Sequence, residues 1–259
     1  MTNREGTPIW YELLTTAPDA AQDFYAAVTG WKFQTPPGGL ERGYRLFSDA
    51  DGEGIGGVMQ MPEGAPFDPI WAVYFGVEDV DASAAKVKSL GGSVHIEPQD
   101  IPGVGRFAFV ADPQGATFYL MRGASDEAST AFAMEKLGHC AWNELVTSDQ
   151  EAALEFYSAL FGWEKSGAMP MGEMGDYTFL KCGDIDLGAM MTRQEDTKRP
   201  FWNFAFSIAD IDAANAAVEA GGGTVYQGPT ELPTEGDWLI QTRDPQGATA
   251  MFVGPRVQG

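Results

Sequence analysis

The sequence contains a long internal repeat, and this feature limits the folds open to the chain more than any other. One copy begins at Gly6 with GTPIWYELLTTAPDAAQDFYAAVTGW, and the second begins 132 residues later, at Gly138, with GHCAWNELVTSDQEAALEFYSALFGW. The identical residues of the two copies include the pairs Trp10 and Trp142, Glu12 and Glu144, Phe24 and Phe156, Tyr25 and Tyr157, and Trp31 and Trp163. A match that stays in register over this length indicates that one domain was duplicated.

The similarity continues through the second part of each copy. The segment WAVYFGVEDVDASAAKVKSLGGSV, from Trp71, matches WNFAFSIADIDAANAAVEAGGGTV, from Trp202. The segment DPQGAT then occurs at Asp112 and again at Asp244. Asp-Pro followed by Gly favours a tight turn, because the Asp side chain bonds the neighbouring backbone and Gly accepts a positive φ.

Two domains of ordinary size fit the 259 residues of the chain. We expect the first over residues 6–123 and the second over residues 137–255. The segment between them, residues 124–136, begins with the small and polar ASDEAST and is the natural linker.

Each copy shows the same order of elements twice. Residues 8–14 are typical of a strand and residues 19–28 of an amphipathic helix, and turns and further strands follow. Residues 70–77 and 81–90 start the same order again. The sequence therefore predicts an α+β fold of tandem domains, each built from two βαβββ modules.

The first helix of each repeat has recognisable ends. Asp19 is the predicted N-cap of the helix over residues 19–28, and Asp149 occupies the same place before its counterpart in the second repeat. Gly30 and Gly162 stand just beyond the two helices, where a glycine commonly ends a helix.

Composition narrows the classes of partner. The formal net charge is −21, from 16 Lys and Arg against 37 Asp and Glu, and such a field disfavours nucleic acid and anionic lipid. The sequence contains neither an apolar run long enough to span a membrane nor the pattern of a signal peptide, so we expect a cytoplasmic protein. Cys140 and Cys182 do not form a CxxC pair and are expected to be small buried hydrophobic residues.

The ordered motifs resemble those of the vicinal-oxygen-chelate superfamily, which includes glyoxalase I, the extradiol dioxygenases and the bleomycin and fosfomycin resistance proteins. The resemblance covers nearly the whole chain and consists of FYxxxxGW (from Phe24 and Phe156), F-x-V/I-x-D (from Phe75 and Phe206) and DPxG (from Asp112 and Asp244). Membership implies that each domain forms a cup from a curved mixed sheet, with the helices outside and the ligand on the concave face.

Enzymes of this superfamily typically hold a divalent metal with His and Glu side chains on the concave face. In this sequence the corresponding positions fall on Trp10, Trp142, Ala72, Asn203, Tyr119 and Met251. None of these residues is a His or a carboxylate, so we predict no cofactor. A divalent metal (Zn, Ni, Fe or Mn) remains an alternative that needs ligands elsewhere, for instance Glu12 or Glu144 with His139.

Glu12 and Glu144 are the candidate catalytic residues. Side chains two apart on a strand share a face, so Glu12 points with Trp10, as Glu144 does with Trp142. Each glutamate is either an acid or hydrogen-bond acceptor for a substrate, or a carboxylate near the rim of the cup that is solvated or bonded to a neighbouring strand.

Neither histidine stands at a metal position of the superfamily. His139 precedes the first strand of the second repeat, and Thr7 replaces it in the first. His95 follows the Gly91-Gly92 turn. We interpret both as surface or strand residues with satisfied hydrogen bonds, although histidine is also a common metal ligand.

Two classes of function follow. The first is a metal-free protein that encloses a small, mostly apolar or aromatic molecule, so that affinity comes from apolar burial. The predicted cavity residues are Trp10, Glu12, Ala72, Tyr74, Tyr119, Trp142, Glu144, Asn203 and Met251. Since the duplication supplies a two-domain arrangement within one chain, we expect a monomer or a weak homodimer.

The second class is an enzyme, either a glyoxalase-type lyase or isomerase or an oxidoreductase of the dioxygenase or hydroxylase kind. Without a metal, Glu12 or Glu144 would be a general base for a proton next to a carbonyl group. The resemblance alone does not decide between binding and catalysis, because one fold supports many reactions.

Overall fold

The structure is a computed structural model, and it describes residues 3–36, 43–65, 67–195, 197–234 and 236–257. The elements of the first repeat are β1 (Pro8–Thr15), α1 (Pro18–Thr29), β2 (Lys32–Gln34), β3 (Arg45–Ser48), β4 (Gly54–Gln60), β5 (Ile70–Gly76), α2 (Val80–Ser89), β6 (Ser93–Ile101), β7 (Gly105–Ala111) and β8 (Thr117–Gly123). Those of the second are β9 (Cys140–Thr147), α3 (Gln150–Phe161), β10 (Glu164–Pro170), η1 (Gly172–Met174), β11 (Asp176–Cys182), β12 (Ile185–Thr192), β13 (Phe201–Ser207), α4 (Ile211–Ala220), β14 (Thr224–Glu231), β15 (Asp237–Arg243) and β16 (Thr249–Pro255). Both repeats are therefore βαβββ followed by βαβββ.

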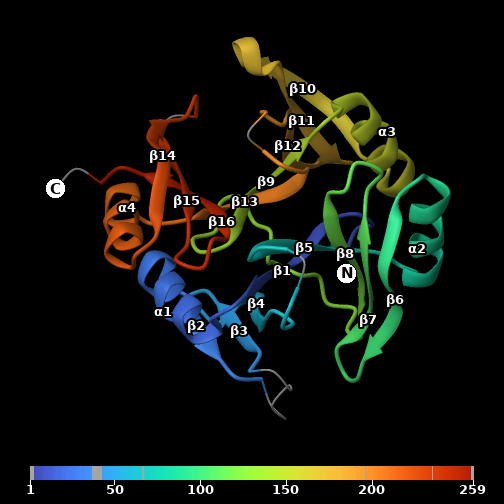
Figure 1. The fold of residues 1–259 in the computed structure, drawn as a ribbon, viewed down its shortest axis with the longest axis horizontal. Coiled ribbons are helices and arrows are strands. Elements are labelled where there is room, and N and C mark those ends of the chain that lie inside the picture. Colours follow the sequence, from blue (N-terminus) through green and yellow to red (C-terminus); the bar gives the residue numbers. More distant parts are fainter. Residues whose placement is uncertain (1–2, 37–42, 66, 196, 235, 258–259) are drawn as a thin grey trace. The chain divides into compact units, whose positions relative to one another are not determined.

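Among the described residues, the strands form two mixed sheets of eight strands with the same order. The first is β2-β3-β4-β1-β5-β8-β7-β6, and the second is β10-β11-β12-β9-β13-β16-β15-β14. Strands β1 and β4 pair in parallel, as do β5 and β8, β9 and β12, and β13 and β16. The predicted α+β fold with tandem repeats is confirmed (Figure 1). In the described part of the chain, no helix is long and apolar enough to cross a membrane.

The chain divides into two compact units, and each unit takes one module from each repeat. Unit 1 contains the chain through Ile9 together with residues 72–129 and 143–202. Unit 2 contains residues 10–71 and 130–142 and the chain from Asn203 onward. The sequence left the pairing of modules open, whereas the structure shows how they pack. In unit 2, α1 packs against α4, and in unit 1, α2 packs against α3 (Figure 1).

A buried hydrogen bond joins the FY motif of one repeat to the DPQG turn of the other. In unit 2, the Tyr25 hydroxyl donates to Asp244 Oδ2 at 3.2 Å and accepts a bond from the Trp71 indole N–H at 2.9 Å. In unit 1, the Tyr157 hydroxyl donates to Asp112 Oδ2, also at 3.2 Å. Two motifs that lie far apart in the sequence are therefore partners in the folded chain.

The aspartates of these turns use their second carboxylate oxygen to hold the turn itself. Asp112 Oδ1 accepts bonds from the amides of Gln114 and Ala116. Burial raises the pKa of Asp112, and the bonds from the backbone and from Tyr157 only partly offset this effect. Asp244 shows the same raised pKa for the same reason, with its bonds coming from its own turn and from Tyr25. Each aspartate therefore holds its turn in place, but its burial makes the ionised carboxylate less favourable than it would be in water.

The tryptophan of the GW motif makes a second contact of this kind. Trp31 donates from its indole N–H to the carbonyl oxygen of Gly138 at 2.7 Å, within unit 2. Trp163 donates to the carbonyl oxygen of Gly6 at 3.1 Å, within unit 1. At Gly6, where φ is +77°, a Cβ would lie 2.5 Å from Phe161 Cβ, so the close approach of the ring requires glycine.

The predicted helix ends are correct with one exception. Asp149 caps α3 by accepting a bond from the amide of Ala152, and Gly30 and Gly162 end their helices with φ of +75° and +74°. The prediction that Asp19 caps α1 is wrong. Pro18 occupies the start of the helix, so Asp19 falls in the first turn, where it pairs with Arg45 instead.

Removal of the buried tyrosine hydroxyls should destabilise the fold. We expect Tyr25→Phe and Tyr157→Phe each to lower the free energy of unfolding by about 1 to 3 kcal/mol, because a buried carboxylate loses a donor. Urea denaturation followed by circular dichroism measures this change. Tyr226→Phe, at a tyrosine that is 49% exposed, is the control and should change stability by less than about 0.5 kcal/mol. Equal effects of all three substitutions would contradict the structural role of the pairs.

The raised pKa of the turn aspartates predicts a pH dependence. A carboxyl group whose pKa is higher in the folded chain favours folding below its unfolded pKa of about 4, and this advantage is lost as pH rises through the folded pKa. Between pH 4 and 7, Asp112→Asn and Asp244→Asn should therefore become progressively more favourable relative to the wild type. Unfolding free energies measured across this range test the trend, with Asp23→Asn, on the exposed face of α1, as the control. A difference that stays constant with pH would contradict it.

Candidate functional site

Glu12 lies on β1 within a short chain of hydrogen bonds. The Tyr44 hydroxyl donates to Glu12 Oε2 at 2.9 Å and accepts a bond from the indole N–H of Trp10 at 3.3 Å. The Glu12 residue is only 2% exposed. Since one hydroxyl contacts both residues, Trp10 and Glu12 share a face of the strand, as the alternation of the sequence predicts.

The opposite face of β1 belongs to the core of unit 2. The Tyr11 ring packs edge-on against Phe204 and Phe206, with centroid distances of 5.1 and 5.6 Å. Because neighbouring side chains on a strand point to opposite faces, this packing turns Trp10 and Glu12 away from the aromatic core.

A glycine on the neighbouring strand makes room for the tyrosine ring. Gly57, on β4, is in register with Glu12 on β1. A Cβ at Gly57 would lie 2.0 Å from the Tyr44 hydroxyl oxygen and 2.4 Å from Cζ of the same ring. The absence of a side chain at position 57 therefore allows Tyr44 to lie across the strand and to reach Glu12.

The second repeat contains the same pair in unit 1. The Tyr177 hydroxyl donates to Glu144 Oε2 at 2.9 Å, and Glu144 is also buried. Ala189 stands opposite Glu144 on β12, in the place that Gly57 occupies in the first repeat. Trp142 lies on β9, half-buried. We call Glu12 with Tyr44, and Glu144 with Tyr177, the two Glu–Tyr pairs.

Neither tyrosine of these pairs was predicted as a site residue from the sequence. Tyr44 comes just before β3 and Tyr177 lies near the start of β11. A signal was present, because YRLF and YTFL place a tyrosine at equivalent points of the two repeats. This correspondence marks both tyrosines as candidates, but it does not identify the glutamates as their partners.

Two of the predicted cavity residues stack on each other in unit 1. The rings of Tyr74, on β5, and Tyr119, on β8, lie 4.1 Å apart and are nearly parallel, at 6°. Phe109, on β7, packs against Tyr119 at 4.5 Å. Ala72 is buried on β5. Phe75 packs against Trp163 and Trp202 instead, so Tyr74 faces away from the core of unit 1.

The remaining predicted cavity residues, Asn203 and Met251, are buried in unit 2. Met251 is in register with Ala205, between β16 and β13. Asn203 Oδ1 is a buried acceptor that receives no hydrogen bond from the described residues. A buried amide oxygen of this kind costs free energy unless a donor reaches it.

His139 belongs to a separate cluster in unit 2. Its Nε2 lies 3.0 Å from Asp49 Oδ2 and its Nδ1 lies 2.6 Å from the carbonyl oxygen of Thr130. Asp49, Glu53 and His139 each offer one ligand atom, and these three atoms lie within 4.8 Å of one another. The cluster contains neither Glu12 nor Glu144, the residues that the sequence suggested as partners of His139 in an alternative metal site. Asp49 and Glu53 were not anticipated, because they lie 86 to 90 residues from His139 in the sequence.

Hydrogen bonds stabilise the ionised form of Asp49. Burial on its own would raise the pKa of this carboxyl group, but the bonds from His139 and from the amides of Glu53 and Asp51 outweigh it and lower the pKa. Glu53 pairs with Lys136 and accepts a bond from the Thr130 hydroxyl at 2.6 Å, and these contacts lower its pKa as well. Both carboxylates are therefore anionic at neutral pH.

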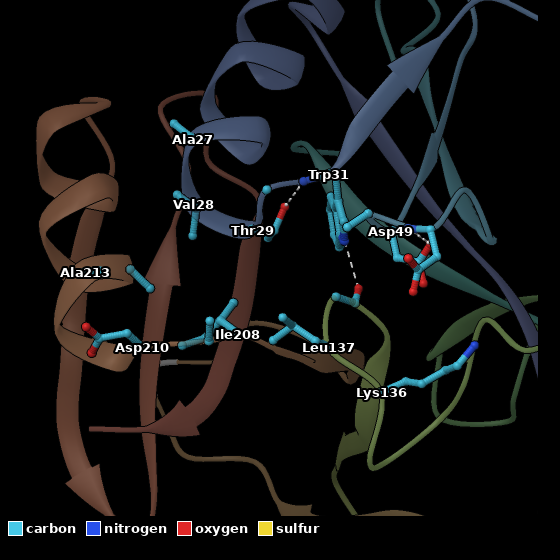
Figure 2. A pocket seen from close by; sticks show the side chains of 16 residues that line it. Ala27, Val28, Thr29, Trp31, Asp49, Lys136, Leu137, Ile208, Asp210 and Ala213 are labelled. Atoms are coloured by element: carbon cyan, nitrogen blue, oxygen red, sulfur yellow. Dashed lines mark hydrogen bonds between the residues drawn. The ribbon is translucent and has the colours of Figure 1, made fainter. Parts of the chain in front are cut away.

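A cavity of about 490 Å³ adjoins this cluster (Figure 2). The end of α1, the loop after β3, the segment before β9 and the start of α4 line it. Its walls include Val28, Trp31, Asp49, Lys136, Leu137 and Ile208. The cavity thus combines apolar side chains with one carboxylate of the cluster.

The two cysteines and His95 lie outside this cluster. Burial raises the pKa of Cys140 to about 12, so its thiol stays protonated, and Cys182 is also buried with a raised pKa. This confirms both cysteines as buried residues. His95 is exposed, with Nε2 3.5 Å from the Ser93 hydroxyl.

Comparison with known proteins identifies the family. The family model of the Glyoxalase/Bleomycin resistance protein/Dioxygenase superfamily matches residues 8–120 and again residues 136–252. The chain belongs to this superfamily. The resemblance inferred from the motifs is therefore confirmed.

Curated members of the superfamily match over almost the full chain. "Putative glyoxylase CFP32" of Mycobacterium tuberculosis is 35% identical over 257 residues, which cover 98% of this chain and 97% of that protein. "Anthracycline biosynthesis protein DnrV" of Streptomyces peucetius is 32% identical over 265 residues, with 94% and 91% of the two chains covered.

Solved structures of superfamily members share the fold. The Mn(II)-bound glyoxalase from Novosphingobium aromaticivorans has a TM-score of 0.68 and 19% identity, and the match covers 97% of this chain and 82% of that one. The 2,3-dioxygenase LapB from Pseudomonas sp. KL28 also has a TM-score of 0.68, with 13% identity and coverage of 100% and 95%.

The side chains at the metal positions that the superfamily resemblance implies do not fit a metal ion. In the described structure these positions hold the indoles of Trp10 and Trp142, the methyl group of Ala72, the amide of Asn203, the phenol of Tyr119 and the thioether of Met251. The indole and methyl groups offer no ligand atom, and a lone amide or thioether does not suit a divalent ion such as Mn²⁺. The phenol of Tyr119 is a single oxygen donor, and it does not make a ligand set by itself. These positions therefore supply no ligand set for a divalent metal beside the two Glu–Tyr pairs.

A side chain at position 57 should disrupt the first Glu–Tyr pair. We expect Gly57→Val to lower the free energy of unfolding by about 1 to 3 kcal/mol, because the new side chain displaces Tyr44 and breaks its bond to buried Glu12. A double-mutant cycle with Tyr44→Ala, measured by urea denaturation, isolates this effect. Gly57→Val should cost less in the Tyr44→Ala background. Equal costs in both backgrounds would show that Gly57 does not act through Tyr44.

Proposed function

We propose that the protein binds a small, flat, mostly apolar aromatic molecule, and that the Glu–Tyr pairs orient it. The main support is that the first strand of each repeat carries a buried glutamate whose carboxylate accepts a hydrogen bond from a tyrosine hydroxyl. Two different units of the structure keep the same polar pair, although the residues around the pairs differ.

The chemistry of the pair suits an oriented hydrogen bond to a ligand. A carboxylate has two oxygens and about four acceptor sites, so Glu12 can accept from a ligand hydroxyl while Tyr44 holds its Oε2. Such charge-assisted bonds are stronger than neutral ones, and they become stronger still where water is excluded. Glu144 and Tyr177 offer the same arrangement.

Aromatic side chains next to the pairs favour a flat ligand. Trp10 donates to Tyr44 and shares its face of β1 with Glu12, and Trp142 occupies the matching position on β9. Offset stacking on such rings contributes about 0.5 to 1.5 kcal/mol beyond the area buried. Within unit 1, the stacked Tyr74 and Tyr119 are a further pair of aromatic rings, and Met251, the counterpart of Tyr119, is buried in unit 2 together with Asn203.

A curated relative supports the ligand class. The Streptomyces peucetius protein that is 32% identical to this chain carries the name of an anthracycline biosynthesis protein. Anthracyclines are fused-ring aromatic molecules with phenolic and quinone oxygens, which match an aromatic wall with a buried acceptor. A neutral or cationic ligand also suits the net charge of −21.

Catalysis is the second candidate function, and the burial of Glu12 favours it. A carboxylate that is 2% exposed and bonded to a phenol is placed to remove a proton next to a carbonyl group, as in a glyoxalase-type lyase or isomerase. The relative from Mycobacterium tuberculosis carries the name of a glyoxylase. In both candidates the same glutamates are the acting residues.

Binding of 1,4-dihydroxyanthraquinone, followed by quenching of tryptophan fluorescence, tests the proposal. We expect the double variant Glu12→Gln with Glu144→Gln to bind the probe about 10- to 100-fold more weakly, because a charged acceptor worth about 1.5 to 3 kcal/mol is lost. Glu151→Gln, an exposed position in the first turn of α3, is the matched control and should bind as the wild type does.

The same variants separate binding from catalysis. An enzyme should lose turnover of methylglyoxal with a thiol in the double glutamine variant, and a binding protein should show only the change in affinity. Probe affinity that is equal in the wild type and the double variant, with no turnover in either, would contradict both candidate functions.

A further inference from the structure

We propose that Asp49, Glu53 and His139 form a binding site for a divalent transition-metal ion that uses neither Glu12 nor Glu144. In the described part of the chain, these residues are the one group of three or more His, Cys, Asp or Glu side chains whose ligand atoms converge. Two carboxylates and one neutral imidazole balance the charge of a divalent ion. The imidazole favours ions of the series from Mn²⁺ to Zn²⁺ over Ca²⁺ and Mg²⁺, which prefer oxygen ligands only.

Hydrogen bonds orient the imidazole ring for ligation through Nε2. A carbonyl oxygen can only accept, so the 2.6 Å contact with Thr130 means that His139 Nδ1 carries a proton. Nε2 is then the nitrogen that turns toward the carboxylates. Metal-binding histidines commonly donate their second N–H to a backbone carbonyl in this way, which fixes the orientation of the ring.

The first carboxylate is also positioned in advance. Asp49 Oδ1 accepts bonds from the amides of Asp51, at 3.0 Å, and Glu53, at 2.8 Å. These bonds leave Oδ2 directed at His139 Nε2. His139 is fully buried and Asp49 is 6% exposed, so two of the three ligands are fixed within the protein.

The equivalent place in unit 1 shows that the fold does not require this cluster. His139 corresponds to Thr7, and Asp49, which follows β3, corresponds to Cys182 at the end of β11. Thr7 donates to the carbonyl oxygen of Arg4 at 2.7 Å, and Cys182 donates to that of Glu5 at 3.3 Å. Neutral side chains thus complete one unit where the other buries a His and an Asp.

Each unit also contains an equivalent ion pair, so the two units can be compared at this place. Lys136 pairs with Glu53 in unit 2, and its counterpart Arg4 pairs with Asp184 in unit 1. A basic residue bonded to a carboxylate is therefore common to the two units, whereas the His–Asp pair is specific to unit 2. The feature that unit 2 adds is the one that supplies metal ligands.

A divalent ion at this site would take the place of two positive charges that the cluster holds without it. A proton lies between His139 Nε2 and Asp49 Oδ2, and the ammonium group of Lys136 contacts Glu53. A divalent ion would replace these two positive charges, since the proton leaves to solvent and Lys136 turns away. Glu53 can adjust, because its side chain is 40% exposed. Lys136 is therefore a competitor of the ion for Glu53.

The adjoining cavity gives the site access to solvent and to small molecules. Asp49 and Lys136 both line this space of about 490 Å³, between the end of α1 and the start of α4 (Figure 2). With three protein ligands, a metal ion keeps at least one coordination position for water or another ligand, and this pattern is typical of reactive rather than structural sites. A small molecule with an oxygen donor would fit the remaining position.

Binding of Mn²⁺ and Zn²⁺ to the full chain tests this site. We expect one ion per chain in titration calorimetry, and nitrogen modulation from an imidazole ligand in the pulsed electron paramagnetic resonance spectrum of bound Mn²⁺. His139→Gln should abolish the nitrogen signal. Glu53→Gln, at the exposed ligand, should weaken binding at least tenfold, and Lys136→Met should strengthen it by removing the competing ammonium group.

Asp184→Asn is the matched control, because it removes a carboxylate from the ion pair of unit 1 and should leave metal affinity unchanged. If His139→Gln does not fold, the contrast between Glu53→Gln and Lys136→Met still decides the question. Failure of Mn²⁺ and Zn²⁺ to bind stoichiometrically would overturn the proposal. Binding that is equal in the wild type, Glu53→Gln and Lys136→Met would overturn it as well.

Discussion

The buried bond between a helix tyrosine and a turn aspartate is the interaction on which the rest of the structure depends. Tyr25 bonds Asp244 in unit 2, and Tyr157 bonds Asp112 in unit 1. In each case the helix comes from one repeat and the turn from the other. The bond therefore makes the two repeats mutually dependent, because neither can satisfy its buried carboxylate alone. The Trp31 and Trp163 indoles reinforce this exchange by bonding the glycine carbonyls at the start of the other repeat.

This dependence explains why the motifs of the sequence recur with such regular spacing. The recurring motifs are Phe-Tyr on the helix, Gly-Trp after it and Asp-Pro-Gln-Gly at the turn. Their residues make the contacts that hold each unit together, and none of them belongs to the two Glu–Tyr pairs. Their recurrence reports a packing requirement, and the catalytic or binding chemistry must be sought at other positions. The motifs that identify the family consequently carry no information about the ligand.

The secondary structure was predictable from local patterns, whereas the contacts between distant residues were not. Alternation on β1 placed Trp10 and Glu12 on one face, and the glycines after α1 and α3 marked the helix ends correctly. Asp49 could not be connected with His139, because 90 residues separate them and no local pattern brings the loop after β3 to the residue before β9. Tyr44 was missed for a different reason. Its role depends on the missing side chain of Gly57, and a strand glycine has several structural explanations.

The two repeats have kept one polar feature and changed most of what surrounds it. Both carry a buried glutamate that accepts a bond of 2.9 Å from a tyrosine. Opposite the glutamate on the neighbouring strand, Gly57 of the first repeat is replaced by Ala189 in the second. Elsewhere in the repeats, Ala72 is replaced by Asn203 and Tyr119 by Met251. The glutamate–tyrosine hydrogen bond is therefore kept, while the size and polarity of the side chains at these other positions differ. If each repeat binds a ligand, the two should recognise the same functional group on molecules of different shape, because buried polar groups set orientation and the apolar walls set fit.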